Sequence, residues 1–203
     1  LMWACQGGHD QCARALLEKG AQVDHANDDG STALIHACKN GHDVCARPLL
    51  EAGAKVDHAD KNGATALMHA CGRGHDLCAG TLLEAGANLE AKFPHGHTAL
   101  MYSCKNGHHL CARALLEAGA QVDHAANNGD TALMLSCRNN HAQCVQTLLG
   151  WKANVNDDTL KFADSHCPEC LPFLKAYIHE RRNPNKRPRS EVEESKINVH
   201  GKG

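Results

Sequence analysis

Apolar and polar positions along the chain recur with a constant step of 33 residues. In each period a threonine precedes an Ala-Leu pair, and a histidine separates two short apolar segments. So many registers do not coincide by chance, which makes the chain an array of one repeating unit. The register is marked by Leu34, Leu67, Leu100 and Leu133 and by two ladders of cysteines, Cys5, Cys38, Cys71, Cys104 and Cys137 in one and Cys12, Cys45, Cys78, Cys111 and Cys144 in the other.

Residues 27–59 predict the structure of one unit. Thr32 is placed to cap a helix over 33–39 by accepting from a backbone N–H of its first turn. A tight Asn-Gly turn and a second helix over about 43–51 follow, and a polar, turn-prone segment completes the unit. Pro48 falls inside the second helix, where we expect it to remove a hydrogen bond or introduce a kink.

Such a unit is too small to bury its own apolar face, so the units must stack on one another as a solenoid. Leu1 corresponds to Leu34, so the first unit lacks its own turn and cap, and we expect the sequence to be trimmed from a longer chain. The array is predicted over 1–158, with that truncated first unit and full units at 27–59, 60–92, 93–125 and 126–158.

The frame Asp60-x-x-Gly63-x-Thr65-x-Leu67, with Gly74-His75, Leu82-Leu83 and Gly86-Ala87, resembles the ankyrin repeat, whose period is also 33. The resemblance implies an all-α solenoid of stacked helix-turn-helix units with β-hairpin-like turns. It also implies a non-enzymatic protein–protein interaction module, acting as a scaffold or a substrate-recruiting adaptor. The family's Thr-Pro-Leu-His motif has lost its Pro and His here, so we expect lower stability than in a consensus array.

The register breaks after residue 158. Two helices are predicted within 159–181 as a degenerate capping unit, and 182–203 reads as a disordered charged tail. A basic run at this junction resembles a nuclear localisation signal, with a solvated charge cluster as the alternative. It favours a cytoplasmic or nuclear location, and its basic residues are Arg181, Arg182, Lys186, Arg187 and Arg189.

Composition narrows the function classes. Hydrophobic residues make up 42% of the 203 residues and charged residues 22%, as in folded proteins. The net charge of −2 argues against a strongly basic nucleic-acid binder. No apolar run approaches the roughly 18 residues of a membrane span. We therefore expect neither a nucleic acid nor a membrane as partner. We also expect the protein to be a monomer.

The cysteines and histidines allow two interpretations. The ladder cysteines behave as small buried hydrophobes, or they form a thiol or zinc sensor. Cys167 and Cys170 form a C-x-x-C pair, which reads as part of a capping helix or as half of a zinc or redox site. The recurring histidines suit hydrogen bonds to neighbouring loops. No phosphate loop or nucleophile elbow is present. We predict no catalytic residue, metal or cofactor here, although an enzyme encoded upstream of Leu1 could use the array as a targeting arm.

The positions that differ between units are the candidates for partner binding. Charges at the ends of the first helices, Lys39, Arg73, Lys105 and Arg138, predict a basic stripe for an acidic or phosphorylated peptide or surface. Phe93 is predicted as an exposed anchor. The remaining candidates are Asp29, Lys61, Asn62, His95, Tyr102 and Asn128.

Overall fold

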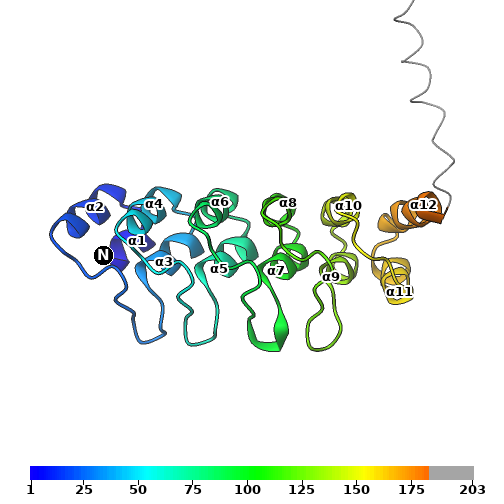
Figure 1. Cartoon of the computed structure of the whole chain (residues 1–203), viewed down its shortest axis with the longest axis horizontal. Helices are drawn as coiled ribbons and strands as arrows, with labels where there is room; N and C mark the ends of the chain where they lie inside the picture. Colours follow the sequence, from blue (N-terminus) through cyan, green and yellow to red (C-terminus); the bar gives the residue numbers. More distant parts are fainter. Residues whose placement is uncertain (183–203) are drawn as a thin grey trace, which may run out of the picture.

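The computed structural model describes residues 1–182 and shows a row of helix pairs stacked side by side (Figure 1). The first helix of each pair lies in one layer and the second in the other, and long loops project below the first layer. The first helices are α1 (Met2–Gln6), α3 (Ala33–Lys39), α5 (Ala66–Arg73), α7 (Ala99–Lys105), α9 (Ala132–Arg138) and α11 (Asp157–His166). The second helices are α2 (Asp10–Glu18), α4 (Asp43–Glu51), α6 (Asp76–Glu84), α8 (His109–Glu117), α10 (Ala142–Gly150) and α12 (Cys170–Arg182), and η1 spans Pro94–Gly96.

The predicted threonine caps are present in the four full repeats. The hydroxyl of Thr32 accepts from the backbone N–H of Ile35 at 3.4 Å. The other three threonines cap α5, α7 and α9 in the same way, at 3.3 to 3.5 Å. Each capping threonine has an extended backbone, which turns the chain out of the hairpin and into the helix. Leu1 is the N-cap residue of α1, and its side chain makes no capping hydrogen bond.

The loops between repeats form narrow hairpins. Isolated bridges pair Ala59 with Thr65 and Ala125 with Thr131. Adjacent hairpins are also joined, since the N–H of Lys61 donates to the carbonyl of Asp29 at 2.9 Å. A Cβ on Gly30 would lie 2.9 Å from that Lys61 nitrogen, so a side chain cannot replace the hydrogen there without moving the neighbouring hairpin.

Acidic side chains in the loops connect consecutive repeats. In each case a carboxylate oxygen accepts from a backbone N–H located 31 positions later, at 2.7 to 3.0 Å. Charge-assisted bonds of this kind are stronger than neutral ones. The pairs are Asp24 with Lys55, Asp57 with Asn88, Glu90 with Gln121 and Asp123 with Asn154.

The core consists mainly of Leu, Ala, Met and Cys. α4 continues through Pro48, a buried residue, so the proline does not interrupt the helix. α11 packs on α9 and α12 packs on α10, so this helix pair covers the last full repeat. α12 includes Arg182, one residue beyond the predicted cap, and the rest of the predicted tail lies outside the described residues.

Candidate binding surface

Charge is segregated between the two layers of helices. The helices α3, α5, α7 and α9 contain no Asp or Glu and carry Lys or Arg near their C-terminal ends. The helices α2, α4, α6 and α8 together carry seven Asp or Glu and three Arg. We call the exposed side of α3, α5, α7 and α9, with the hairpins beside them, the inner surface. Its helices attract acidic groups, whereas the second layer repels them.

The predicted basic stripe is not a single column. Lys39 and Lys105 occupy equivalent positions, but Gly72 takes that position in the second full repeat. Arg73 follows one residue later, where the other repeats have asparagine, and α5 is correspondingly one residue longer. The step of 33 applied to Lys39 gives Gly72 directly, so the sequence contained the signal for this shift.

The side chain of Arg138 makes contacts within the array. Its guanidinium makes two hydrogen bonds to the carboxylate of Asp130, at 2.7 and 2.9 Å. It also lies 4.5 Å from the ring centre of Phe162 in α11. Arg138 therefore joins the last hairpin to the capping unit. Our prediction that it belongs to the same partner-binding stripe as Lys39 missed this ion pair, whose partners are eight positions apart.

A column of mostly ring-bearing residues follows the inner surface, one per repeat, and consists of Trp3, His36, His69, Tyr102 and Leu135. In the first three full repeats this side chain contacts the hairpin residue nine positions earlier. His36 is 3.5 Å from Asn27, and His69 is 3.0 Å from Asp60. Tyr102 meets Phe93 edge to face at 5.4 Å between ring centres.

Phe93 differs from the prediction of an exposed anchor. It is half-buried at the base of its hairpin, because it bridges to His97 and packs on Tyr102. The tip itself is made by Pro94 and His95, both exposed, with His95 at a positive φ of 73°. Phe93 contributes instead to a cavity of about 230 Å³ between the second and third full repeats.

The other predicted partner-binding residues lie on the hairpins. Asp29, Lys61, Asn62 and Asn128 are exposed. The amide of Asn128 donates to Asp130 at 2.9 Å, so this side chain also orients the carboxylate that holds Arg138. The structure thus places these residues along one edge of the inner surface, beside the helix ends.

Burial and neighbouring groups shift the pKa of three side chains on the inner surface. Burial lowers the pKa of His36, and the positive charge of Lys39 lowers it further. Burial acts to raise the pKa of Asp130, but the hydrogen bonds from Arg138 and Asn128 outweigh it, so the pKa lies below its ordinary value. The pKa of Asp60 is lowered in the same way. Burial acts to raise it, but the hydrogen bonds from His69 and from backbone N–H groups outweigh burial.

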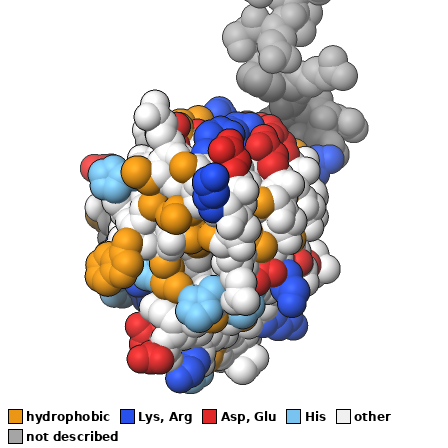
Figure 2. Space-filling view, turned by 90° about the vertical axis from the view of Figure 1, so that its left-hand side faces the viewer, with side chains coloured by type: hydrophobic (Ala, Val, Ile, Leu, Met, Phe, Trp, Pro, Cys, Tyr) orange, Lys and Arg blue, Asp and Glu red, His pale blue; other side chains and the backbone are white. Residues whose placement is uncertain are grey.

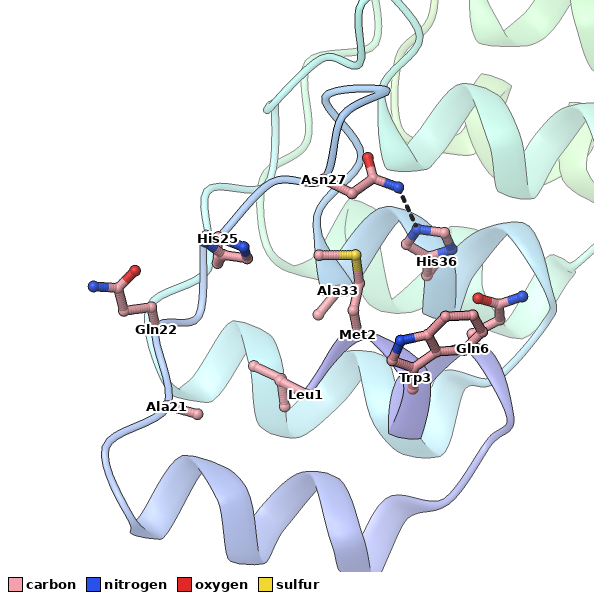
Figure 3. A pocket seen from close by; sticks show the side chains of 10 residues that line it. All are labelled: Leu1, Met2, Trp3, Gln6, Ala21, Gln22, His25, Asn27, Ala33 and His36. Carbon is pink, nitrogen blue, oxygen red and sulfur yellow. Dashed lines mark hydrogen bonds between the residues drawn. The ribbon is translucent and has the colours of Figure 1, made fainter.

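A cavity of about 530 Å³ lies at the N-terminal end of the inner surface (Figure 3). Trp3 and His36 stand on one side and Gln22 and His25 on the other. Trp3 is 83% exposed. Figure 2 looks at this end of the array and shows hydrophobic side chains together with histidine rings.

The recurring histidines serve packing between repeats, as predicted. A Cβ on Gly74 would lie 2.5 Å from Nδ1 of His108, so each such ring closes over the glycine of the previous repeat. The Nε2 atom of His141 lies 3.1 Å from the carbonyl oxygen of Lys105. These rings are therefore occupied by structural contacts.

The ladder cysteines are buried, with Cys12 as the exposed member. Burial raises the pKa of Cys137 to about 12, which keeps its thiol protonated and unreactive. Within residues 1–182 no group of three or more His, Cys, Asp or Glu side chains is arranged to hold a metal ion. Cys167 and Cys170 form a disulfide at the turn between α11 and α12, a bond that we did not predict from the sequence.

The stack of helix pairs defines the class of protein, a repeat solenoid. The sequence profile described as Ankyrin repeats (3 copies) matches residues 1–93 and 89–159, so the chain belongs to the ankyrin-repeat family. The crystal structure of the human ASB11 ankyrin repeat domain is similar, with 30% identity and a TM-score of 0.80, over 87% of this chain and 82% of that chain. No curated protein matches the chain.

Ankyrin repeats are generally protein–protein interaction modules, and the fold is typically non-enzymatic. The solved structures include 518 matching chains, so the fold alone does not identify the partner. Among the described residues there is no helix with the length and apolar character that a membrane span requires. What the chain binds must be argued from its own surface.

Proposed function

We propose that the chain is a recruiting module that binds an acidic segment of another protein along its inner surface. The observation that carries the proposal is the segregation of charge. The helices of the inner surface hold Lys39, Arg73 and Lys105 and no carboxylate. Phosphate groups would be attracted in the same way, since Arg and Lys recognise carboxylate and phosphate alike.

The geometry of the array suits an extended segment. Successive repeats lie on the order of 10 Å apart, as packed helices do. An extended chain advances about 3.3 Å per residue, so every third residue meets the next repeat. Trp3, His36 and Tyr102 would then contact side chains at regular intervals, with the cations beside them. The surface is complete within one chain, which is consistent with a monomer.

A charge-reversal experiment tests the proposal. A random peptide library is selected on the wild-type protein, and the enriched sequences are expected to be rich in Asp and Glu. The inner variant Lys39→Glu/Arg73→Glu/Lys105→Glu should lose more than about tenfold in affinity for them, because it places like charges opposite each other. Arg138 is left unchanged because it is part of the fold.

The control variant is Arg14→Glu/Arg47→Glu/Arg113→Glu. It makes the same change in net charge on the second layer, where these arginines are more than half exposed and form surface ion pairs. Such pairs contribute little to stability, about 0–1 kcal/mol each. Both variants must keep the wild-type circular dichroism spectrum. Equal affinity losses in the two variants, or enriched peptides without an acidic bias, would refute the proposal.

We also propose that the basic run acts as a nuclear localisation signal. Arg181 and Arg182 are exposed in the last turn of α12, and Lys186, Arg187 and Arg189 lie outside the described residues. A fluorescent fusion should accumulate in nuclei and lose that accumulation in a Lys186→Ala/Arg187→Ala variant. Unchanged distribution would leave the run as a solvated charge cluster.

A further inference from the structure

A cavity between the second and third full repeats lies beside Gly72, which has no side chain. The other full repeats place Lys39, Lys105 or Arg138 at this position. A Cβ on Gly72 would lie 3.8 Å from the Cβ of Tyr102, an ordinary contact, so a small side chain fits there. We call this cavity of about 230 Å³ the Gly72 pocket.

The floor of the Gly72 pocket is apolar and fixed in position. Met68 is 4% exposed, and the edge-to-face contact between Phe93 and Tyr102 holds both rings. Small-molecule sites generally begin at about 300 Å³. The pocket is smaller than that, and its size and lining fit one aliphatic or aromatic side chain.

The rim of the pocket supplies one available cation. The amide of Asn106 donates to the carbonyl of Gly72 at 2.8 Å, and His69 is paired with Asp60. Arg73 is exposed and makes no ion pair within the described part of the chain. A group bound in the pocket would therefore lie next to an unpaired guanidinium, which binds carboxylates with two parallel hydrogen bonds.

We propose that the Gly72 pocket receives one apolar side chain of the partner segment, and that the carboxylate of an adjacent Asp or Glu pairs with Arg73. This inference rests on the proposed function and adds to it a selectivity for segments with an apolar residue next to an Asp or Glu. Buried apolar anchors surrounded by a polar rim contribute most of the affinity at many interfaces. The other full repeats carry a long charged side chain, Lys or Arg, in place of Gly72, so we assign the selectivity to this site.

The test compares fluorescein-labelled acidic peptides that differ only in one central residue, which is Leu, Phe, Ala or Ser between glutamates. Affinity is measured by fluorescence anisotropy. On the wild-type protein the Leu or Phe peptide should bind at least about tenfold more tightly than the Ala peptide, as expected for a side chain that fills a pocket. Equal affinities for all four peptides would overturn the inference while leaving the proposed function intact.

The decisive variant is Gly72→Lys/Arg73→Asn, which gives this repeat the Lys-Asn sequence of Lys39-Asn40 and Lys105-Asn106. It keeps one cation and fills the pocket. The Ala peptide should bind within about twofold of its wild-type affinity, because the charge of the surface is unchanged, while the preference for Leu or Phe disappears. Gly72→Ala serves as a folded control that leaves most of the pocket open and keeps the preference.

The outcomes separate the two ideas. A preference that persists in Gly72→Lys/Arg73→Asn would place the apolar anchor elsewhere and overturn the inference. Failure of every peptide to bind the wild-type protein would overturn the inference together with the proposed function. Circular dichroism and the thermal midpoint show whether each variant is folded before its affinity is interpreted.

Discussion

The Nε2 atom of His69 lies 3.0 Å from the carboxylate of Asp60, nine positions earlier in the chain. The equivalent pair is Asn27 with His36 in the first full repeat and Phe93 with Tyr102 in the third. One geometric position thus joins hairpin to helix by a polar contact, a hydrogen bond to a carboxylate or an aromatic contact. Because these three pairs share a position but not a chemistry, the chemistry there is free to differ from repeat to repeat.

In the fourth full repeat the equivalent pair is Ala126 and Leu135, and a second contact fixes the hairpin instead. Asp130 is 5% exposed and accepts both hydrogen bonds of Arg138. Arg138→Met should lower the free energy of unfolding by about 1–3 kcal/mol, because it leaves a buried carboxylate without its partner. Urea denaturation measures the change.

Two further variants control this experiment. Arg73→Met removes an exposed cation and should change the free energy of unfolding by less than about 0.5 kcal/mol. Asp130→Asn combined with Arg138→Met should recover part of the loss, because no unpaired charge is then buried. Equal effects of the two single arginine variants would show that the pair with Asp130 contributes nothing to stability.

The same carboxylate predicts a dependence of stability on pH. Since the pKa of Asp130 in the folded state lies below its ordinary value of 3.8, the folded state binds fewer protons than the unfolded state. The stabilisation is therefore complete above the ordinary value and is lost as the pH falls through the lower, folded-state value. Denaturation at a series of acidic pH values should show a steeper loss for the wild type than for Asp130→Asn, and parallel curves would contradict it.

Much of the fold could be predicted because a repeat presents each helix several times in register. The threonine caps, the paired helices and the capping unit required only local patterns. The contacts between Asp60 and His69 and between Asp130 and Arg138 were not predicted, because a bond across eight or nine positions depends on how the hairpin folds back. The Gly72 pocket could not be predicted, because a glycine in the sequence does not show which side chains surround it. Tyr102 and Phe93 are brought beside Gly72 only by the packing of neighbouring repeats.

Two glycines in the second full repeat predict opposite effects of the same substitution. Gly80 lies inside α6, and a Cβ added there would meet nothing within 4 Å, so Gly80→Ala should stabilise the protein by about 0.5–1 kcal/mol. Gly74 has a φ of 78°, and a Cβ there would meet His108 at 2.5 Å, so Gly74→Ala should destabilise it. Thermal unfolding followed by circular dichroism measures both, and shifts in the same direction would refute the contacts described.

The free thiols provide a test between a packing role and a sensing role for the cysteine ladders. Cys12 is exposed, and the other free cysteines are buried, with burial raising the pKa of Cys5 and of Cys137 to about 12. In the native protein an aromatic disulfide reagent should modify Cys12 quickly and the others only after unfolding. A Cys12→Ser variant should then show no fast phase. Rapid modification of several thiols in that variant would favour the thiol sensor over packing.

The position of His36 predicts how binding of an acidic peptide depends on pH. Burial and the charge of Lys39 lower its pKa in the free protein, with His69 adding to the effect and Asp29 opposing it. A bound carboxylate favours the charged imidazole, so binding takes up a proton and the affinity rises as the pH falls below about 6.5. His36→Gln should flatten this dependence between about pH 5.5 and 7.5 while the affinity at the upper end stays the same.

Fluorescence anisotropy measures the affinity over that pH range. The matched control is His109→Gln, which changes a histidine on the second layer of helices. If both variants keep the wild-type slope, His36 does not face the bound segment, and the path proposed for the segment along the inner surface must be moved away from the first full repeat.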